Sequence, residues 1–254
     1  MTLLRTPSLR VDGKRALVTG GTRGIGLAAA TALAEAGAAV TVVARHATEV
    51  DEVVASLEAA GYTADGRAFD VTDHAAARAF VEAAEPYDVL VNSAGIARHA
   101  PFLDITDADY RSVMEINVAA TLFLSQAVAR RLVAAGRPGS IIHISSQMGH
   151  VAGPSRALYA ASKHAVEGLA RGMAIDLAPH NIRVNSICPT FIETALSAKS
   201  LADPDFRAWV LGKIKLGRLG RLEEIMGPVV FLASEASSLM TGSSLMVDGG
   251  WTAE

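Results

Sequence analysis

A tyrosine and a lysine four residues apart, Tyr159 and Lys163, form the pair in this sequence best suited to proton transfer. In a helix this spacing places both side chains on one face, about 6 Å apart along the axis. A phenol with a pKa near 10 is a weak acid/base at neutral pH, and a nearby ammonium group would lower that pKa. The pair therefore predicts an acid/base that gives a proton to a substrate oxygen or removes it.

A serine thirteen residues before the tyrosine supports this interpretation. Ser146 follows the apolar run Ile141–Ile144, which predicts a buried strand. Ligands of open α/β sheets bind in the crevice at the carboxyl ends of such strands. A hydroxyl at that place can donate a hydrogen bond to a carbonyl oxygen beside the tyrosine. Serine, tyrosine and lysine together favour carbonyl/alcohol interconversion.

A glycine-rich segment, residues 19–26, lies between the first predicted strand and a helix. Its sequence is Thr-Gly-Gly-Thr-Arg-Gly-Ile-Gly. Glycines permit a tight turn that brings backbone N–H groups, and the positive end of the helix, against a pyrophosphate. A glycine-rich turn can also be only a turn. Its place between strand and helix favours dinucleotide binding.

Short β-branched runs alternate with Ala-rich amphipathic stretches along the whole chain. The predicted strands are Arg15–Thr19, Ala39–Ala44, Arg67–Phe69, Asp88–Asn92, Ser140–Ser145, Arg183–Cys188 and Ser244–Val247. The predicted helices are Ile25–Ala36, Glu49–Ala60, Asp73–Ala84, Asp107–Ala135, Ala157–Ala178 and Leu222–Ser234. This order predicts an α/β fold with a doubly wound parallel sheet in a three-layer α/β/α arrangement. Residues 1–254 are expected to form one domain, and the least regular part, residues 190–215, is the expected substrate lid.

The composition excludes several classes of protein. Half of the 254 residues are hydrophobic and the net charge is −3, which does not favour nucleic acid or an anionic membrane as partner. We see neither a signal peptide nor a membrane-spanning segment, so a cytoplasmic enzyme is expected. The single cysteine, Cys188, predicts an inert buried thiol. The seven histidines show no ligand spacing, so no metal is expected.

Taken together, the motif Thr-Gly-x3-Gly-x-Gly and the Ser146, Tyr159 and Lys163 set resemble the short-chain dehydrogenase/reductase family, over Val11 to Trp251. The resemblance implies a Rossmann fold of about seven strands, hydride transfer with a nicotinamide dinucleotide, and a homotetramer. The segments 226–234 and 247–251 are similar to the sugar-acid members, the gluconate and deoxygluconate dehydrogenases. The 3-oxoacyl carrier-protein reductases are the alternative.

The family's functional positions map onto this sequence one by one. Asn117 matches the asparagine that supports a water-linked proton relay to Lys163, and the serine–tyrosine spacing selects Ser146 over Ser145. Two positions depart from the family pattern, Ser93 for asparagine and Thr190 for glycine. The positions expected to contact the cofactor are Gly20, Thr22, Arg23, Gly24, Ile25, Gly26, Arg45, Asp70, Val71, Asn92, Ala94, Gly95, Tyr159, Lys163, Pro189, Ile192 and Thr194.

The end of the second predicted strand favours NADP(H) over NAD(H), while NAD(H) stays possible. An acidic residue there would accept the ribose hydroxyls and repel a 2′-phosphate, but Ala44 occupies the place and Arg45 follows. Arg23 is a second candidate cation for the phosphate. The alternative is that both arginines are only solvated.

Other interpretations stay open at this stage. A dinucleotide sensor without catalysis would lack the tyrosine, and an epimerase would need a larger C-terminal part. His99, Gln147, His150 and Arg156 are predicted near the substrate pocket, where each is either a substrate contact or an ordinary loop residue. An apolar stripe at helical spacing either packs on the sheet or pairs two subunits. Its residues are Val113, Ile116, Ala120, Phe123 and Ala127.

Overall fold

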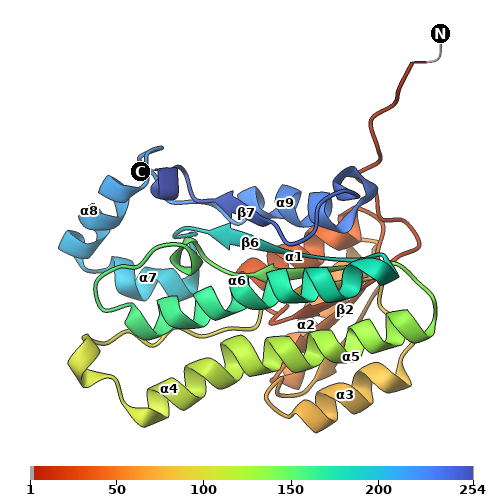
Figure 1. Cartoon of the computed structure of the whole chain (residues 1–254), viewed down its shortest axis with the longest axis horizontal. Helices are drawn as coiled ribbons and strands as arrows, with labels where there is room; N and C mark the ends of the chain where they lie inside the picture. Colours follow the sequence, from red (N-terminus) through yellow and green to blue (C-terminus); the bar gives the residue numbers. More distant parts are fainter. Residues whose placement is uncertain (1–2, 254) are drawn as a thin grey trace.

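Seven parallel strands form the sheet at the centre of this computed structural model (Figure 1). The structure describes residues 3–253, except for the side chains of Leu196 and Lys199. The strand order is β3-β2-β1-β4-β5-β6-β7, a doubly wound order that confirms the predicted fold class. The strands are β1 Arg15–Thr19, β2 Ala39–Ala44, β3 Ala64–Ala68, β4 Val89–Asn92, β5 Gly139–Ile144, β6 Ile182–Pro189 and β7 Ser244–Val247.

Helices cover both faces of the sheet and bury its apolar side chains. On one face lie α1 Gly24–Glu35, α2 Ala47–Ala59 and α9 Glu223–Ala233, which enclose a core around Leu33, Val42 and Leu232. On the other face lie α3 His74–Ala83, α5 Ala120–Ala134 and α6 Ala157–Leu177, around Leu90 and Leu132. Central strands buried from both sides explain why they appear in the sequence as continuous apolar runs.

The third strand was predicted at the wrong residues. It spans Ala64–Ala68 rather than Arg67–Phe69. Its sequence, Ala-Asp-Gly-Arg-Ala, is largely exposed because β3 is an edge strand that pairs only with β2. An exposed edge strand carries no apolar run, so the pattern that located the central strands was missing here.

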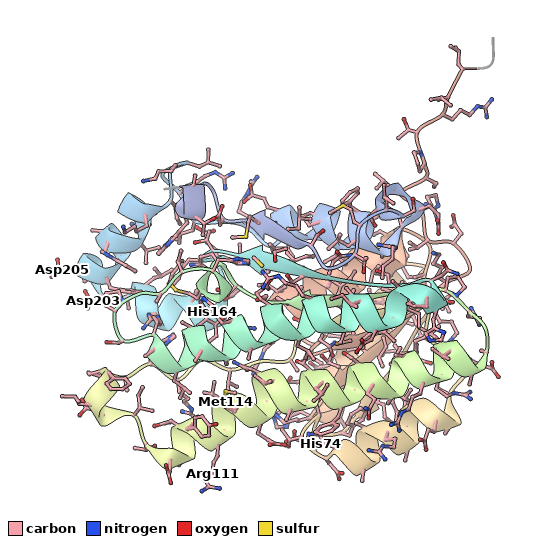
Figure 2. The ribbon with its side chains drawn as sticks, in the orientation of Figure 1. His74, Arg111, Met114, His164, Asp203 and Asp205 are labelled. Carbon is pink, nitrogen blue, oxygen red and sulfur yellow. The ribbon has the colours of Figure 1, made fainter. Side chains whose placement is uncertain are left out.

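The predicted helix Asp107–Ala135 is broken by one wider turn. It consists of α4 Asp107–Met114, a π-helical turn at Glu115–Ala119 and α5. By length and composition the run Asp107–Ala134 could cross a membrane, but half of its most apolar window is buried in the fold. It packs against α3 and α6. His74 at the start of α3 lies beside this run (Figure 2), with its Nε2 3.1 Å from Glu115 Oε1. The run therefore packs as a helix of the core.

The expected apolar stripe on this helix mostly packs inward. Val113, Ala120 and Ala127 are buried, whereas Phe123 keeps 37% of its surface exposed. Packing on the sheet therefore accounts for most of the stripe.

Residues 190–215, expected to be irregular, contain two helices, α7 Ala195–Leu201 and α8 Pro204–Lys213. Thr194 and Ser197 form a capping box at the start of α7. Asp203 accepts hydrogen bonds from two backbone N–H groups at the start of α8, where Pro204 takes the first helical position (Figure 2). These are ordinary helix-start signals that the apolar pattern alone did not reveal.

The two helices carry aromatic side chains onto the sheet's carboxyl edge. Phe206 and Trp209 of α8 contact Phe191 and Trp251 with ring centroids 5.3–5.8 Å apart. This aromatic cluster attaches the segment over the pocket described next.

Candidate active site

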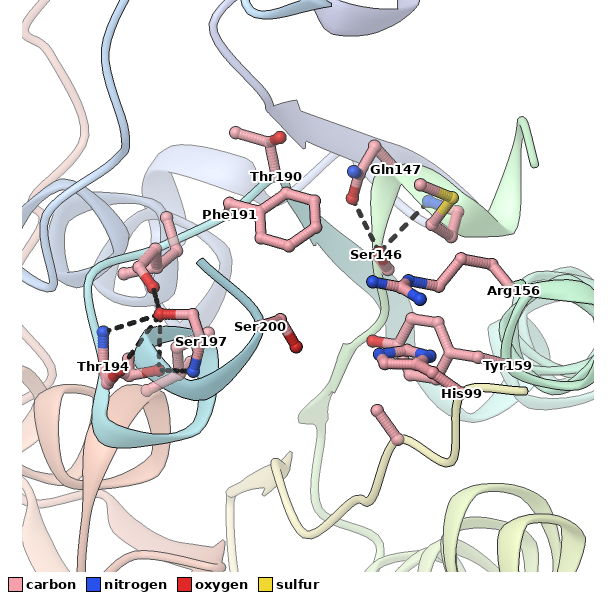
Figure 3. A pocket seen from close by; sticks show the side chains of 14 residues that line it. His99, Ser146, Gln147, Arg156, Tyr159, Thr190, Phe191, Thr194, Ser197 and Ser200 are labelled. Carbon is pink, nitrogen blue, oxygen red and sulfur yellow. Dashed lines mark hydrogen bonds between the residues drawn. The ribbon is translucent and has the colours of Figure 1, made fainter. Parts of the chain in front are cut away.

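A pocket opens at the carboxyl edge of the sheet and brings together segments far apart in the sequence (Figure 3). The glycine-rich segment contributes Ile25, the segments after β4 and β5 contribute polar residues, and α6 contributes Tyr159. The lining residues are Ile25, Ala97, His99, Ser146, Gln147, Met148, Arg156, Tyr159, Thr190, Phe191, Ile192, Thr194, Ser197 and Ser200. A binding site at this edge is what the doubly wound topology predicts.

Ser146 and Tyr159 both line this pocket and lie next to each other. The Ser146 hydroxyl donates to Gln147 Oε1 at 2.7 Å and accepts from the Met148 backbone N–H at 3.1 Å. Burial raises the pKa of the Tyr159 phenol, while the hydrogen bond with Ser146 and the positive charge of Arg156 act to lower it. The phenol is therefore protonated at neutral pH and able to donate.

Lys163 lies behind the tyrosine rather than in the pocket. Its Nζ is 5.7 Å from the Tyr159 ring centroid and donates to the Ile144 carbonyl oxygen at 2.9 Å. Burial lowers the pKa of Lys163 to about 8, although the negative charge of Glu167 opposes the shift. The pKa of the Tyr159 phenol is raised overall, because burial outweighs the groups that lower it, Ser146 and Arg156, and the expected lowering by Lys163 is not among those contributions.

Asn117 occupies the π-helical turn, and both polar atoms of its side chain form hydrogen bonds. Its Oδ1 accepts from the Ile96 backbone N–H, and its Nδ2 donates to the Ile96 carbonyl oxygen, both at 2.9 Å. A further hydrogen bond reaches Ser162 Oγ at 3.1 Å, in the turn of α6 between Tyr159 and Lys163. Asn117 therefore connects the loop after β4 to the turn that carries the acid/base pair, and π-helical turns often mark functional sites.

The glycine-rich segment fits a pyrophosphate. Gly20 and Gly24 have φ values of +64° and +53°, which side chains rarely adopt. A Cβ added to Gly24 would meet only Thr194 Cγ2, at 3.7 Å, so the segment has open space in front of it. Arg23 precedes α1 and makes no side-chain capping bond, which leaves the helix's first N–H groups for an anion.

The two expected phosphate-binding arginines are placed where such a contact is possible. Arg23 and Arg45 are both exposed, and within residues 3–253 neither forms an ion pair. The charge of Arg45 acts on the carboxyl group of Asp70 at the next strand end. The Thr22 hydroxyl, by contrast, donates to Glu49 Oε2 at 3.0 Å.

Two of the residues expected to contact the cofactor, Asp70 and Asn92, make structural contacts. Asp70 Oδ1 accepts from the backbone and side chain of Thr72, at 2.9 and 2.8 Å, and so closes a turn after β3. Asn92 Nδ2 donates to Ser125 Oγ at 2.9 Å. Val71, Asn92 and Ala94 also line a second small hollow.

The two departures from the family pattern have different consequences. The backbone N–H groups of Ser93 and Ala94 both donate to Thr19 Oγ1, so Ser93 leaves that turn intact. Thr190 places a hydroxyl in the pocket, and this buried oxygen has no hydrogen-bond partner within residues 3–253. Gly95 lies close to Asn117 and to the lysine of the acid/base pair, because a Cβ there would be 3.3 Å from Asn117 Oδ1 and 3.9 Å from Lys163 Nζ.

The segment after β6 faces the glycine-rich segment. Pro189 ends β6, Ile192 pairs with Gly220 in an isolated bridge, and Thr194 caps α7 while it lines the pocket. The pocket thus joins the glycine-rich segment, the acid/base residues and this last segment, as the sequence motifs indicated.

Of the four additional polar residues, three line the pocket and one does not. His99, Gln147 and Arg156 face it, with the His99 ring edge-on to Tyr159 at 5.8 Å between centroids (Figure 3). His150 instead lies 3.4 Å from Glu167, behind the pocket.

Sequence reasoning missed the buried carboxylate of Glu167. It accepts hydrogen bonds from Ser186, Ser244 and Cys188, and its side chain is 2% exposed. His150, Glu167 and Cys188 bring three potential ligand atoms within 4.8 Å of one another, although no spacing along the chain shows it. Burial and the negative charge of Glu167 raise the pKa of Cys188 to about 12, so the thiol stays protonated and inert.

A parallel doubly wound sheet with this pocket defines a dinucleotide-dependent oxidoreductase, and the comparisons agree. Residues 20–252 match the family model described as enoyl-(acyl carrier protein) reductase, and the chain belongs to the short-chain dehydrogenase/reductase family. It is an NAD(P)-dependent oxidoreductase of secondary alcohols and ketones.

Named relatives come from the sugar-converting part of this family. Gluconate 5-dehydrogenase of Gluconobacter oxydans (strain 621H) is 42% identical over 246 residues, 95% of this chain and 96% of that protein. D-erythrulose reductase of Gallus gallus is 40% identical, over 96% of this chain and 98% of that protein. The crystal structure of a gluconate 5-dehydrogenase from Burkholderia cenocepacia J2315 in complex with NADP and tartrate has a TM-score of 0.93 and 39% identity, with 97% and 98% of the two chains covered.

Proposed function

We propose that this enzyme interconverts a secondary alcohol and a ketone on a small polar substrate, a sugar acid or a polyol, with NADP(H) as the preferred cofactor. The observation that carries the proposal is the apposition of Ser146 and Tyr159 in a pocket that also contains the start of α1. The similar gluconate 5-dehydrogenase and D-erythrulose reductase are both named for small polyhydroxylated substrates.

Each residue of the acid/base set has a defined role. NADP(H), when bound, supplies or accepts the hydride. Ser146 donates a hydrogen bond to the carbonyl oxygen and polarises it. Tyr159 gives its phenolic proton to that oxygen during reduction and removes it during oxidation. Lys163 returns a proton to Tyr159 after each reduction and binds the nicotinamide ribose. Asn117 maintains the turn through which a water-linked proton relay reaches the lysine. None of these steps needs a metal.

Preference for NADP(H) follows from the charges at the end of β2. Ala44 offers no carboxylate to repel a 2′-phosphate, and the exposed Arg45 and Arg23 have no competing ion pair within residues 3–253. A guanidinium group binds phosphate in a bidentate manner. The similar gluconate 5-dehydrogenase crystallised with NADP supports this preference.

Three further features belong to the proposal. The segment 190–215, with α7 and α8, acts as the substrate lid over the pocket. The enzyme works in the cytoplasm. It assembles as a homotetramer, in which apolar side chains left exposed on α5 and α6, such as Phe123 and Ile175, pack between subunits. Light scattering at micromolar concentration tests the assembly, and a monomer would contradict it.

A substrate panel with both cofactors tests the reaction. Aldonates, ketoaldonates, polyols, ketoses and β-ketoesters are assayed at neutral pH by the change in NADPH or NADH absorbance. Turnover of a sugar acid or polyol and its ketone is the expected result. Turnover confined to β-ketoesters would favour a 3-oxoacyl reductase instead, and binding of NADPH without any turnover would favour a dinucleotide sensor.

A further inference from the structure

A buried arginine forms one wall of the substrate pocket and has no acidic partner. Arg156 directly precedes α6, three residues before Tyr159, and is 7% exposed. Its guanidinium carbon lies 4.9 Å from the ring centroid of Phe206 in α8. Its side chain lies beside Tyr159, His99 and Ser146 (Figure 3). Within residues 3–253 it forms no ion pair.

The charge on this guanidinium is costly to bury and cannot be lost. Burial lowers the pKa of Arg156 from its usual value. An arginine nevertheless stays protonated in proteins, so the pocket wall remains positive. Buried charges are usually paired, because an isolated one forfeits its hydration. The contact with Phe206 offsets part of that loss and supplies no hydrogen-bond acceptor.

None of the pocket residues that the structure describes supplies the missing negative charge. The fourteen lining residues include no aspartate and no glutamate. His99, the other ionisable group beside Tyr159 and Arg156, is neutral at pH 7, because burial and the nearby charge of Arg156 lower its pKa to about 4. The described pocket therefore carries one net positive charge next to the acid/base residues.

We propose that Arg156 binds the carboxylate of the substrate and makes this enzyme selective for hydroxy or keto acids over the corresponding neutral polyols and ketoses. This deepens the proposed function and rests on it. A planar carboxylate accepts two parallel hydrogen bonds from one guanidinium group. Because Arg156 and Tyr159 lie about one helical turn apart, the carboxylate lies within a few carbon atoms of the reacting carbon.

The position of Arg156 also explains why α8 packs against this wall of the pocket. Phe206 places the first turn of α8 against the guanidinium, so the arginine is covered from the lid side while its donors face the pocket. An anion bound there would complete the burial of Arg156 with a compensating charge. A neutral substrate would leave the arginine buried and unpaired, which is the physical basis of the selectivity.

The test compares an aldonate with the hexitol of the same configuration, each as substrate with NADP⁺. Arg156→Gln is expected to lower kcat/KM for the aldonate by about 10- to 150-fold, the range for a lost charge-assisted hydrogen bond. The value for the hexitol should change by less than about threefold, because no such bond is made to it. Arg156→Lys, which keeps the charge without the bidentate geometry, should lie between the wild type and Arg156→Gln for the aldonate.

Two controls accompany these variants. Arg78→Gln removes the same charge from the exposed surface of α3, away from the pocket and the lid, and should leave both substrates unaffected. The dissociation constant of NADPH, measured by fluorescence titration, should be the same in wild type and both Arg156 variants. A common loss on aldonate and hexitol in Arg156→Gln, or a wild type that prefers the hexitol, overturns the assignment.

Two further experiments identify the type of anion and distinguish failure of this inference from failure of the proposed function. If a hexitol phosphate is turned over more efficiently than the aldonate, and depends on Arg156, the carboxylate assignment is wrong. If the wild type turns over no substrate at all, the proposed function fails. Binding then still decides the inference: the aldonate should raise the melting temperature of the wild-type complex with NADPH, but not that of Arg156→Gln, and equal shifts would overturn it.

Discussion

Replacing the buried Lys163 with methionine should stabilise the fold at neutral pH while it abolishes most of the activity. The Nζ of Lys163 is buried, and its pKa in the folded protein is about 8, against 10.5 for a lysine side chain free in water. A depressed lysine pKa means that the folded state disfavours the charged form. At pH 7 the lysine is charged in both states, so the folded state bears this penalty in full.

The magnitude follows from the difference between the two pKa values. A shift from 10.5 to about 8 corresponds to about 3 kcal/mol at pH values below both. Removing the lysine also leaves the Ile144 carbonyl oxygen without its donor at 2.9 Å, which costs about 1–3 kcal/mol. Methionine fills a similar volume without a charge. The net expectation at pH 7 is a stabilisation of up to about 2 kcal/mol.

The sign of the pH dependence makes the test specific. Between pH 8 and 10.5 the folded state has released the proton that the unfolded state still binds, so the wild type gains stability relative to Lys163→Met as the pH rises. The advantage of the variant should therefore shrink over this range and reverse near its upper end, where the charge penalty has gone and only the lost hydrogen bond to Ile144 remains. Other groups that titrate there are common to both proteins and cancel in the difference.

Urea denaturation at several pH values between 7 and 10.5 provides the measurement. Lys213→Met, at an exposed site on α8, is the matched control and should show no such trend. A Lys163→Met variant that is less stable than wild type at pH 7, by an amount that does not change with pH, would refute the reasoning. It would mean that the hydrogen bond to Ile144 outweighs the cost of burying the charge.

Further predictions concern the reaction, the cofactor and the core. Tyr159→Phe removes only the hydroxyl, so NADPH should still bind while turnover falls by at least ~10²-fold, and retained turnover would exclude the tyrosine as the acid/base. Arg45→Ala should weaken NADPH binding by about 10-fold and leave NADH unchanged, as titration of each cofactor would show, because an exposed charge-assisted contact is worth about 1.5 kcal/mol. Glu167→Ala should lower the unfolding free energy by about 2–4 kcal/mol in urea, because it removes the acceptor of Ser186, Ser244 and Cys188, and an unchanged midpoint would contradict the importance of that network.

Much of this site was predictable because its determinants are local in sequence. Tyr159 and Lys163 are related by one turn of a single helix, and the glycine-rich segment is positioned by the strand and helix on either side of it. Strands buried on both faces carry apolar runs, so the parallel sheet and its functional edge also followed from pattern. The exposed edge strand β3 and the helices α7 and α8 did not, because their apolar signal is weak and polar caps mark their limits.

The remaining features arise only where distant segments meet. Arg156 is buried beside His99 and under Phe206, and it has no acidic partner among the residues that line the pocket. Nothing near it in the sequence shows this, because His99 comes from the loop after β4 and Phe206 from α8. The Glu167 network likewise joins α6 to β6, β7 and the loop after β5. The spacing of residues along one helix or turn determined the acid/base pair and the dinucleotide loop. Burial and net charge are sums over neighbours brought together by folding, and therefore the tertiary structure alone decided the lysine's pKa and the positive charge of the pocket.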